Sequence, residues 1–353
     1  MVAAGLVRGR AAKLAIVAIV ALGVSSCGGS EPSADPAAAS GDKPAATSGG
    51  KVGFAQANFG NGWYEVQAEG VKAEMKKLGY DVTVVSGGGK PLTQNSQIQT
   101  FITQGVKGVV MNPTDPRAVA SSVAALKKAK IPFVLVNTSL DESLAGNAYC
   151  YVAEDEVENS RQIGIEMANV LSKKYGSSAT VKALLVKGFP GDSNSARRDK
   201  GFKAGYASVA GAPKLNLLPD AFGEFNADGA LGPVRSIATA NPDLQAVFSV
   251  TDSMLPGIQT ALKGAGIWEK VIIAGYDARM SIVKEMKDNP DGPIIATVAN
   301  RPLEQGSVGS QMLDKAIKGI PQSEACPGGN HFLEPTLVTP ATAAAYYKAD
   351  VSY

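Results

Sequence analysis

The sequence has little of the material from which most catalytic and metal centres are built. Its 353 residues include a single histidine, His331, and three cysteines. His331 has no cluster of cysteine or acidic residues around it, so we expect no zinc site. No Gly-x-Ser-x-Gly motif occurs, and His331 would be the only base available to a catalytic triad. The composition therefore predicts neither a metal nor another cofactor.

Strong net charge is also absent. The formal net charge is +2, and three basic residues near the start of the chain, Arg8, Arg10 and Lys13, more than account for it. The rest of the chain is close to neutral and lacks the excess of lysine and arginine that binding to nucleic-acid phosphates requires. We therefore expect no nucleic-acid partner.

Only one long apolar run is present, and it lies near the start of the chain. Residues 14–24 are apolar or small, and the run is shorter than the roughly 20 residues that a membrane-spanning helix needs. A basic segment before such a run is typical of a signal peptide. The run ends in Val24-Ser25-Ser26-Cys27, which resembles the lipobox of bacterial lipoproteins. Residues 1–26 are therefore expected to be a lipoprotein signal peptide and Cys27 the lipidated residue; an ordinary signal peptide or an uncleaved anchor is the alternative.

Large apolar residues are scarce in the segment that follows. Residues 27–50 consist mainly of Ala, Ser, Gly, Pro and Asp. Such a segment cannot bury enough apolar surface to fold, so we expect a flexible tether. Beyond it lie the other two cysteines, Cys150 and Cys326. In an exported protein this pair favours a disulfide, and two free buried thiols are the alternative.

The remaining residues, about 300, are too many for one compact core, so two domains are expected. Apolar runs typical of strands alternate with stretches of helical periodicity. In the first half, strands are expected over 52–57, 81–86, 108–111 and 131–137, and helices over 63–78, 94–104 and 118–130. In the second half, strands are expected over 181–187, 215–218, 246–250, 271–275, 294–298 and 336–338, and helices over 156–174, 195–207, 228–240, 254–263, 280–287 and 303–317. This alternation predicts an α/β fold of two Rossmann-like lobes with parallel sheets.

Polar and aromatic residues gather directly after the predicted strands, where ligands bind in parallel α/β sheets. Amides, hydroxyls and carboxylates can make paired hydrogen bonds to a neutral polyhydroxyl ligand, and aromatic rings can pack against its C–H faces. Each such residue taken alone could equally be a turn or a helix cap. The candidate ligand-binding residues are Asn61, Trp63, Tyr64, Asn112, Asn137, Asn194, Arg197, Phe225, Thr251, Asp252, Asp277 and Asn300.

Segments of the chain resemble, in order, the type I periplasmic sugar-binding proteins, the group that includes ribose-, galactose- and xylitol-type binders. They are Asn61-Gly62-Trp63-Tyr64, Asn112-Pro113-Thr114-Asp115, Ala246-Val247-Phe248 leading to Asp252, Gly275-Tyr276-Asp277 and Ala296-Thr297-Val298. The resemblance covers nearly the whole chain from Lys51 onward. It implies two lobes joined by a hinge of three strands, which close on a sugar and present it to the membrane permease of an ABC-type importer. The lobes are expected at 51–154 with 301–330 (N-terminal) and at 155–300 with 331–353 (C-terminal).

The resemblance also implies roles for individual residues. Trp63 and Tyr64 would stack on the sugar, and Asn61 would hydrogen-bond to it. In the second lobe the corresponding contacts would come from an aromatic ring, a carboxylate that accepts from two hydroxyl groups, and an amide, which are Phe225, Asp277 and Asn300.

Departures from the ribose-type members point to a different ligand. Asn137-Thr138 stands where those members have Asp-Arg, and Thr251 stands where they have an asparagine. Their binding arginine falls on Ala196 by equal-length matching, which leaves Arg197 as its neighbour. The loss of charged donors disfavours a pyranose and favours an open-chain polyol such as xylitol, with pentoses and hexoses as the other possibilities.

Enzyme and receptor functions are the alternatives. Gly60-x-Gly62 follows a predicted strand as a dinucleotide-binding motif would, but Glu65 replaces the third glycine. Asp252 and Asp277 could supply the carboxylate pair of a glycosidase. A sugar-sensing receptor could use the same lobes, whereas a repressor would need an N-terminal helix-turn-helix. We expect a monomeric binding protein rather than an enzyme, held by its lipid on the extracytoplasmic face of the cell membrane.

Overall fold

A computed structural model describes residues 49–59, 62–349 and 351. The chain divides into two units, Met1–Ala45 and Ala46–Tyr353, and all described residues belong to the second. The expected signal peptide, the lipidation site Cys27, most of the tether and the candidate Asn61 lie outside the described residues. The first strand begins at Gly50, the last residue of the expected tether. In the described part of the chain, no helix combines the length and the apolar character needed to cross a membrane.

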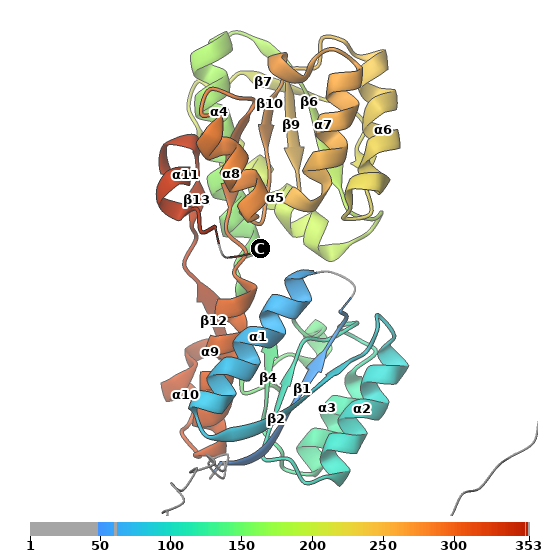
Figure 1. The fold of residues 1–353 in the computed structure, drawn as a ribbon, viewed down its shortest axis with the longest axis vertical. Coiled ribbons are helices and arrows are strands. Elements are labelled where there is room, and N and C mark those ends of the chain that lie inside the picture. Colours follow the sequence, from blue (N-terminus) through green and yellow to red (C-terminus); the bar gives the residue numbers. More distant parts are fainter. Residues whose placement is uncertain (1–48, 60–61, 350, 352–353) are drawn as a thin grey trace, which may run out of the picture. The chain divides into compact units, whose positions relative to one another are not determined.

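The first lobe is a parallel sheet with helices on both faces (Figure 1). Its strands are in the order β12-β5-β4-β3-β1-β2. They span β1 (Gly50–Gln56), β2 (Tyr80–Ser86), β3 (Val109–Met111), β4 (Phe133–Val136), β5 (Cys150–Glu154) and β12 (Asn330–Leu333). The helical segments are α1 (Gly62–Lys77), α2 (Pro91–Thr103), α3 (Ala120–Lys128), η1 (Glu142–Leu144), α9 (Pro302–Ile317), α10 (Gln322–Ala325) and η4 (Pro327–Gly329).

The central strands of this sheet are buried on both faces, which explains why they appear in the sequence as continuous apolar runs. In β1, Val52 and Phe54 join the core beneath α1 and α9, whereas the intervening Ala55 joins the core beneath α2 and α3. The strand therefore has no polar face, and its carboxyl end points the following loop toward one edge of the sheet.

The second lobe repeats this plan with one large core. Its strands are in the order β13-β11-β10-β9-β6-β7, with β8 paired to β6. They span β6 (Thr180–Lys187), β7 (Lys214–Leu217), β8 (Ala221–Phe222), β9 (Ala246–Ser249), β10 (Ile272–Ala274), β11 (Ile294–Val298) and β13 (Leu337–Val338), and β13 alone of these pairs antiparallel. The helical segments are α4 (Glu156–Tyr175), α5 (Ser193–Ser208), α6 (Ala227–Ala240), η2 (Asp252–Met254), α7 (Leu255–Gly264), η3 (Trp268–Lys270), α8 (Met280–Asp288) and α11 (Pro340–Tyr346).

The predicted elements and the α/β fold class of two lobes with parallel sheets are confirmed, but the sequence missed some short elements. Strands β5, β8 and β12 and helices α10 and α11 were not expected. Strand β12 matters most, because it pairs with β5 in the first sheet and extends that sheet to Leu333, beyond the lobe boundary expected at Asn330. Its sequence, Asn-His-Phe-Leu, is mostly exposed and lacks the apolar pattern of a buried strand.

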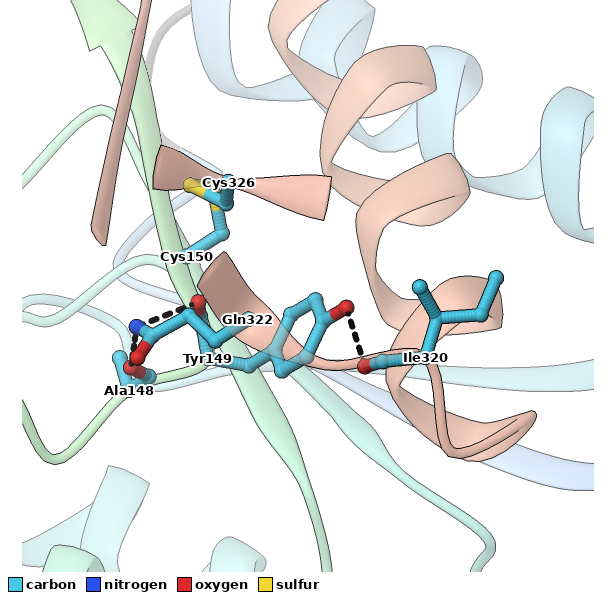
Figure 2. Close-up of a disulfide and its surroundings, with 6 residues drawn as sticks. All are labelled: Ala148, Tyr149, Cys150, Ile320, Gln322 and Cys326. Atoms are coloured by element: carbon cyan, nitrogen blue, oxygen red, sulfur yellow. Dashed lines mark hydrogen bonds between the residues drawn. A yellow bond between two sulfur atoms is a disulfide. The ribbon is translucent and has the colours of Figure 1, made fainter. Parts of the chain in front are cut away.

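The predicted disulfide between Cys150 and Cys326 is present (Figure 2). It joins the start of β5 to the segment that follows α10, and both cysteines are buried. The same two segments are also hydrogen-bonded: Gln322 Nε2 donates to the carbonyls of Ala148 (3.2 Å) and Tyr149 (2.8 Å), and the Tyr149 hydroxyl donates to the Ile320 carbonyl (2.8 Å) (Figure 2). The disulfide and these hydrogen bonds thus hold the segment after α9 against β5, the strand after which the chain first passes to the second lobe.

The chain passes between the lobes after β5, after β11 and after β12, and one arginine joins these passages. Arg301 donates to the Glu154 carboxylate from its backbone N–H (3.1 Å) and from its guanidinium (3.3 Å). Its Nη2 also donates to the carbonyl of Glu334 (2.6 Å). Burial raises the pKa of Glu154, although Arg301 opposes that shift. These bonds hold the three hinge segments together at one point.

Candidate ligand-binding pocket

Residues of both lobes line a pocket of about 510 Å³. Most of them follow the carboxyl ends of strands or begin the helices that come after, as expected for parallel α/β sheets. The first lobe contributes Asn58, Trp63, Tyr64 and Asn137, and the second contributes Phe189, Asp192, Asn194, Arg198, Glu224, Phe225, Asn226, Thr251, Ser253, Asp277 and Asn300. A second cavity of about 360 Å³ lies beside Cys326, and its lining side chains are all neutral.

Aromatic rings form part of the pocket wall in each lobe. Trp63 and Tyr64 open α1 and meet edge to face, with ring centroids 5.3 Å apart. In the second lobe Phe225 and Phe189 have centroids 5.9 Å apart. Burial, and next the charge of Asp192, raise the pKa of the Tyr64 hydroxyl. These rings offer flat apolar surface of the kind that packs against the C–H faces of a sugar.

The Phe225 ring is placed by its own backbone and by a glycine. Phe225 and the preceding Glu224 have φ angles of 56° and 53°, a left-handed conformation that is costly for side chains of this size. The ring packs against Gly188, where an added Cβ would lie 1.9 Å from a Phe225 ring atom. A side chain at position 188 would therefore displace the ring from the pocket wall.

Asp277 is the buried carboxylate of the pocket, with only 4% of its surface exposed. Its Oδ1 accepts from Asn300 Nδ2 (3.2 Å), and its Oδ2 accepts from Thr251 Oγ1 (2.5 Å) and from the backbone N–H of Asp252 (3.3 Å). Burial raises its pKa, while Arg198 acts in the opposite direction. Its two oxygens have about four acceptor sites in all, so the carboxylate can accept hydrogen bonds from a ligand as well.

Arg198 lines the pocket, is only 5% exposed and has several polar and aromatic partners. Its guanidinium stacks on the ring of Tyr276, 3.9 Å from the centroid. It donates to the Val250 carbonyl (2.8 Å) and to Glu156 Oε1 (2.8 and 3.0 Å), and Nη1 lies 3.8 Å from Asp277 Oδ1. Burial would lower its pKa, but Glu156, Tyr276 and Asp277 raise it above the usual value. Arg198 is therefore a permanent positive charge beside Asp277.

Asp252 lies behind the pocket wall and not in it. Its Oδ2 accepts from the backbone N–H of Arg279 (3.0 Å) and from Thr297 Oγ1 (3.0 Å). Burial, and then the charge of Asp277, raise the pKa of Asp252 well above 3.8. Burial thus favours the neutral form of this carboxyl group, which joins the turn after β9 to the turn after β10 and to strand β11.

The structure brings together most of the described candidates: Trp63, Tyr64, Asn137, Asn194, Phe225, Thr251, Asp277 and Asn300 all line the pocket. Whether they contact a ligand stays a prediction. Asn112, Arg197 and Asp252 are not among the lining residues. Asn112 is fully buried and donates to Gln56 Oε1 (2.9 Å) and Gln67 Oε1 (3.1 Å), and Arg197 binds Glu156 and Asn194.

Sequence reasoning missed the lining residues Asn58, Phe189, Asp192, Arg198, Glu224, Asn226 and Ser253. For Arg198 a signal existed. The buried positions of α5 include Ser195, Arg198, Phe202 and Gly205, which recur at the spacing of one helix face. Arg197 falls outside that face. Helical periodicity thus selects Arg198, whereas matching by equal length selects Ala196 and its neighbour Arg197.

Among residues 49–59, 62–349 and 351, no group of three or more His, Cys, Asp and Glu side chains is placed to hold a metal ion. The pocket is lined by hydrogen-bonding and aromatic groups. It can offer carboxylate acceptors, amide and guanidinium donors, and aromatic faces around one small ligand.

Known proteins with a similar sequence and fold are binding proteins of transport systems. The sequence model of a family described as a periplasmic binding protein domain matches residues 52–321. The ribose import binding protein RbsB of Salmonella typhimurium is 31% identical over 251 residues, which cover 71% of this chain and 79% of that protein. The protein of the same name from Escherichia coli is 28% identical over 268 residues, which cover 76% and 85%.

A solved structure is similar over most of both chains. It is an ABC transporter solute binding protein from Mycobacterium smegmatis with bound glycerol, at 25% identity and a TM-score of 0.73. The match covers 86% of this chain and 98% of that one. The extent of the match includes both lobes.

Proposed function

Because the chain belongs to the family of type I periplasmic sugar-binding proteins, we propose that it captures a small sugar or sugar alcohol between its lobes and delivers it to an ABC-type importer. The observation that carries this proposal is the pocket itself. Aromatic rings of both lobes surround a carboxylate, an amide and hydroxyl groups that follow successive strands. This combination matches a ligand with polar edges and apolar faces.

The charges around the pocket support a neutral ligand. Asp192, Glu224 and Asp277 line it, and Arg198 is the basic residue among the described lining residues. The charge of Arg198 is already offset by Glu156 and Asp277, and three of its five N–H groups donate to Glu156 and the Val250 carbonyl. Sugar acids and sugar phosphates would meet an excess of negative charge.

Within the neutral class, the ligand is a pentose, a hexose or a linear polyol such as xylitol. Support for a pentose comes from the relatives named as ribose import binding proteins. Support for an open-chain polyol comes from Asn137, which lines the pocket where ribose-type members have a carboxylate, and from Thr251, whose hydroxyl is already given to Asp277. Neither position supplies a charged group for a sugar ring.

Capture works through the two lobes. A ligand that contacts Trp63 and Tyr64 on one side and Asp277 and Asn300 on the other gains both sets of contacts only in the closed arrangement. It thereby shifts the population toward that arrangement. The membrane permease would recognise the closed form. The protein acts as a monomer on the extracytoplasmic face, held to the membrane through the lipid on Cys27, and uses neither a cofactor nor a catalytic step.

A thermal-shift screen tests the proposal. The panel contains D-ribose, D-allose, D-galactose, myo-inositol, xylitol and glycerol, with D-glucuronate as a charged comparison. A ligand present at about 100 times its Kd stabilises the folded protein by about 2.7 kcal/mol, which raises the melting temperature measurably. We expect a rise with at least one neutral compound and none with glucuronate.

Trp63→Ala provides the site control for that screen. Removing this anchor should weaken binding by about 1–3 kcal/mol. A panel in which no neutral polyhydroxyl compound changes the melting temperature of the wild-type protein would contradict sugar capture. A rise that Trp63→Ala leaves intact would place the site elsewhere.

A further inference from the structure

Behind the pocket, a row of buried side-chain amides runs from one lobe to the other. Gln67 Nε2 donates to Gln305 Oε1 (3.1 Å), Gln305 Nε2 donates to Asn300 Oδ1 (3.0 Å), and Asn300 Nδ2 donates to Asp277 Oδ1 (3.2 Å). Gln56 Nε2 donates to Gln67 Oε1 (3.0 Å) and precedes them. We call Gln56, Gln67, Gln305 and Asn300 the amide relay. The three glutamines are 0% exposed and Asn300 is 8% exposed.

The direction of the relay is fixed independently at its two ends. At the first-lobe end, Gln56 Oε1 accepts from the Ala57 N–H (2.8 Å) and Gln56 Nε2 donates to the Tyr64 carbonyl (3.1 Å). These backbone partners allow only one orientation of the Gln56 amide. At the other end, Asp277 Oδ2 accepts from Thr251 and the Asp252 N–H, and Oδ1 faces the Arg198 guanidinium, so the carboxylate acts as an acceptor and Asn300 presents its Nδ2. Both ends require every amide to donate toward Asp277.

Gln305 connects Gln67 on α1 to Asn300 at the hinge. It lies on α9, whose first residue follows the passage from β11. Helices α1 and α9 approach closely at glycines: an added Cβ at Gly306 would lie 2.3 Å from the Gln67 carbonyl oxygen, and one at Gly70 would lie 2.1 Å from that of Leu303. This contact brings the Gln67 and Gln305 amides within hydrogen-bonding distance. Gln305 itself is not among the residues that line the pocket.

We propose that Gln305 is a positioning residue for ligand recognition, which sets the orientation of the Asn300 amide and so the hydrogen-bonding pattern offered beside Asp277. In the relay orientation, Asn300 has one further N–H besides the one given to Asp277. A ligand hydroxyl can accept a hydrogen bond from that N–H, while the same hydroxyl or the adjacent one on the ligand donates to the Asp277 carboxylate. A turned Asn300 would instead place its Oδ1 beside the Asp277 oxygens, and the same hydroxyl would then lose its donor and face only acceptors. The inference rests on the proposed function, because it assumes that this pair meets the ligand.

The isosteric variant Gln305→Glu tests the orientation directly. An ionised carboxylate at this position only accepts, so it repels Asn300 Oδ1 and turns the amide. A neutral carboxyl group donates through its O–H and accepts through its carbonyl, and so reproduces the glutamine. We therefore expect near wild-type affinity at pH 5 and about a ten-fold or greater loss at pH 8, since a buried group is left with the wrong partner. The probes are D-ribose and xylitol, measured by titration calorimetry.

Gln311→Glu is the matched control. Gln311 is an exposed residue on the same helix that donates to Glu74 Oε1 (2.9 Å) outside the relay. This variant should bind like the wild type at both pH values. The charged groups around the relay are Asp277 and Asp252 in the turns of the second lobe, Arg198 on α5, Arg301 directly before α9, and Glu154 at the end of β5. Tyr276 is the neighbouring titratable hydroxyl. These groups are present in the wild type and in both variants. The pH dependence of wild-type affinity therefore measures the effect of their titration, against which the variants are compared.

A second variant and a ligand-free measurement keep the test decisive. Gln305→Met has a similar length but no polar group, and should weaken binding equally at pH 5 and pH 8. Without ligand, the unfolding midpoint of Gln305→Glu should fall relative to wild type as the pH rises above about 4.3, the usual pKa of a glutamate. The reason is that the fold favours the protonated form of the buried acid.

The outcomes separate this inference from the proposed function. If the wild type binds none of the sugars, capture fails as a function, and the ligand-free midpoints still test the direction of the relay. A Gln305→Glu protein whose affinity and unfolding midpoint follow the wild-type pH profiles would overturn the role of Gln305. Wild-type affinity in Gln305→Met would overturn it as well.

Discussion

Two neighbouring arginines share one carboxylate, and they should differ sharply when removed. Arg197 Nε lies 2.5 Å from Glu156 Oε2, and Arg198 Nη2 lies 2.8 Å from Glu156 Oε1. The Arg197 side chain is 38% exposed, whereas that of Arg198 is 6% exposed. Replacing each with methionine keeps most of the aliphatic length and removes the charge, so the pair isolates the effect of burial.

The expected magnitudes follow from what each change leaves behind. Arg198→Met strips the Val250 carbonyl of its guanidinium donor, removes the stacking on Tyr276 and leaves Asp277 without its nearest positive charge. Breaking a buried pair in this way costs about 3–5 kcal/mol of folding free energy. Arg197 still binds Glu156 in that variant, which favours the lower end of the range. Arg197→Met removes only a partly exposed pair, worth about 0–1 kcal/mol.

Urea unfolding, followed by far-UV circular dichroism, measures both variants against the wild type. We expect the Arg198→Met transition to shift to lower urea by an amount several times that of Arg197→Met, with similar slopes. Titration calorimetry should also show weaker ligand binding for Arg198→Met alone. If the unfolding free energies of the two variants agree within about 1 kcal/mol, the assignment of Arg198 as the buried anchor is refuted.

Two further predictions concern cross-linking and titration. Replacing Cys150 and Cys326 by serine removes a disulfide whose cysteines are 176 residues apart, and the chain-entropy treatment predicts a loss of about 5 kcal/mol of folding free energy. Thermal unfolding should detect this loss, and unchanged stability would contradict it. Ligand affinity should stay the same, because neither cysteine lines the pocket. Burial and Asp277 raise the pKa of Asp252, so the folded protein keeps a proton that the unfolded chain loses above about pH 3.9. Wild-type stability should therefore decline as the pH rises from that value to the folded pKa, and Asp252→Asn should flatten the curve; parallel curves for the two proteins would argue against a protonated Asp252.

The fold was predictable because its central strands are buried on both faces. Strand β4 and residues 52–55 of β1 contain no polar side chain, and segments of helical periodicity separate most of the strands. What the sequence did not reveal is the edge of the first sheet. Strand β12 has exposed side chains and is held by pairing with β5. Its position depends on a tertiary contact with a segment far away in the chain, which no local pattern encodes.

The pocket was predictable where residues follow strands, and less so where a helix positions them. Asn137, Thr251 and Asp277 occupy the loops expected of a ligand site. Asn112 follows a strand as well, yet its amide is used by Gln56 and Gln67 inside the first lobe. A ligand-binding amide and a buried structural amide have the same sequence signature, and only the neighbours distinguish them. Those neighbours come from the end of β1 (Gln56) and from α1 (Gln67), and their contact with the end of β3 is not visible in the sequence.

The threading of the chain also constrains the order in which the molecule can be assembled. The first sheet starts at Gly50 but receives its edge strand only at Asn330–Leu333, and the second sheet receives its last strand at Leu337–Val338. Neither sheet can therefore complete its hydrogen-bonding pattern before residues 330–338 are in place. Both sheets thus depend on one short segment for their completion, and neither can be finished as an independent domain ahead of the other.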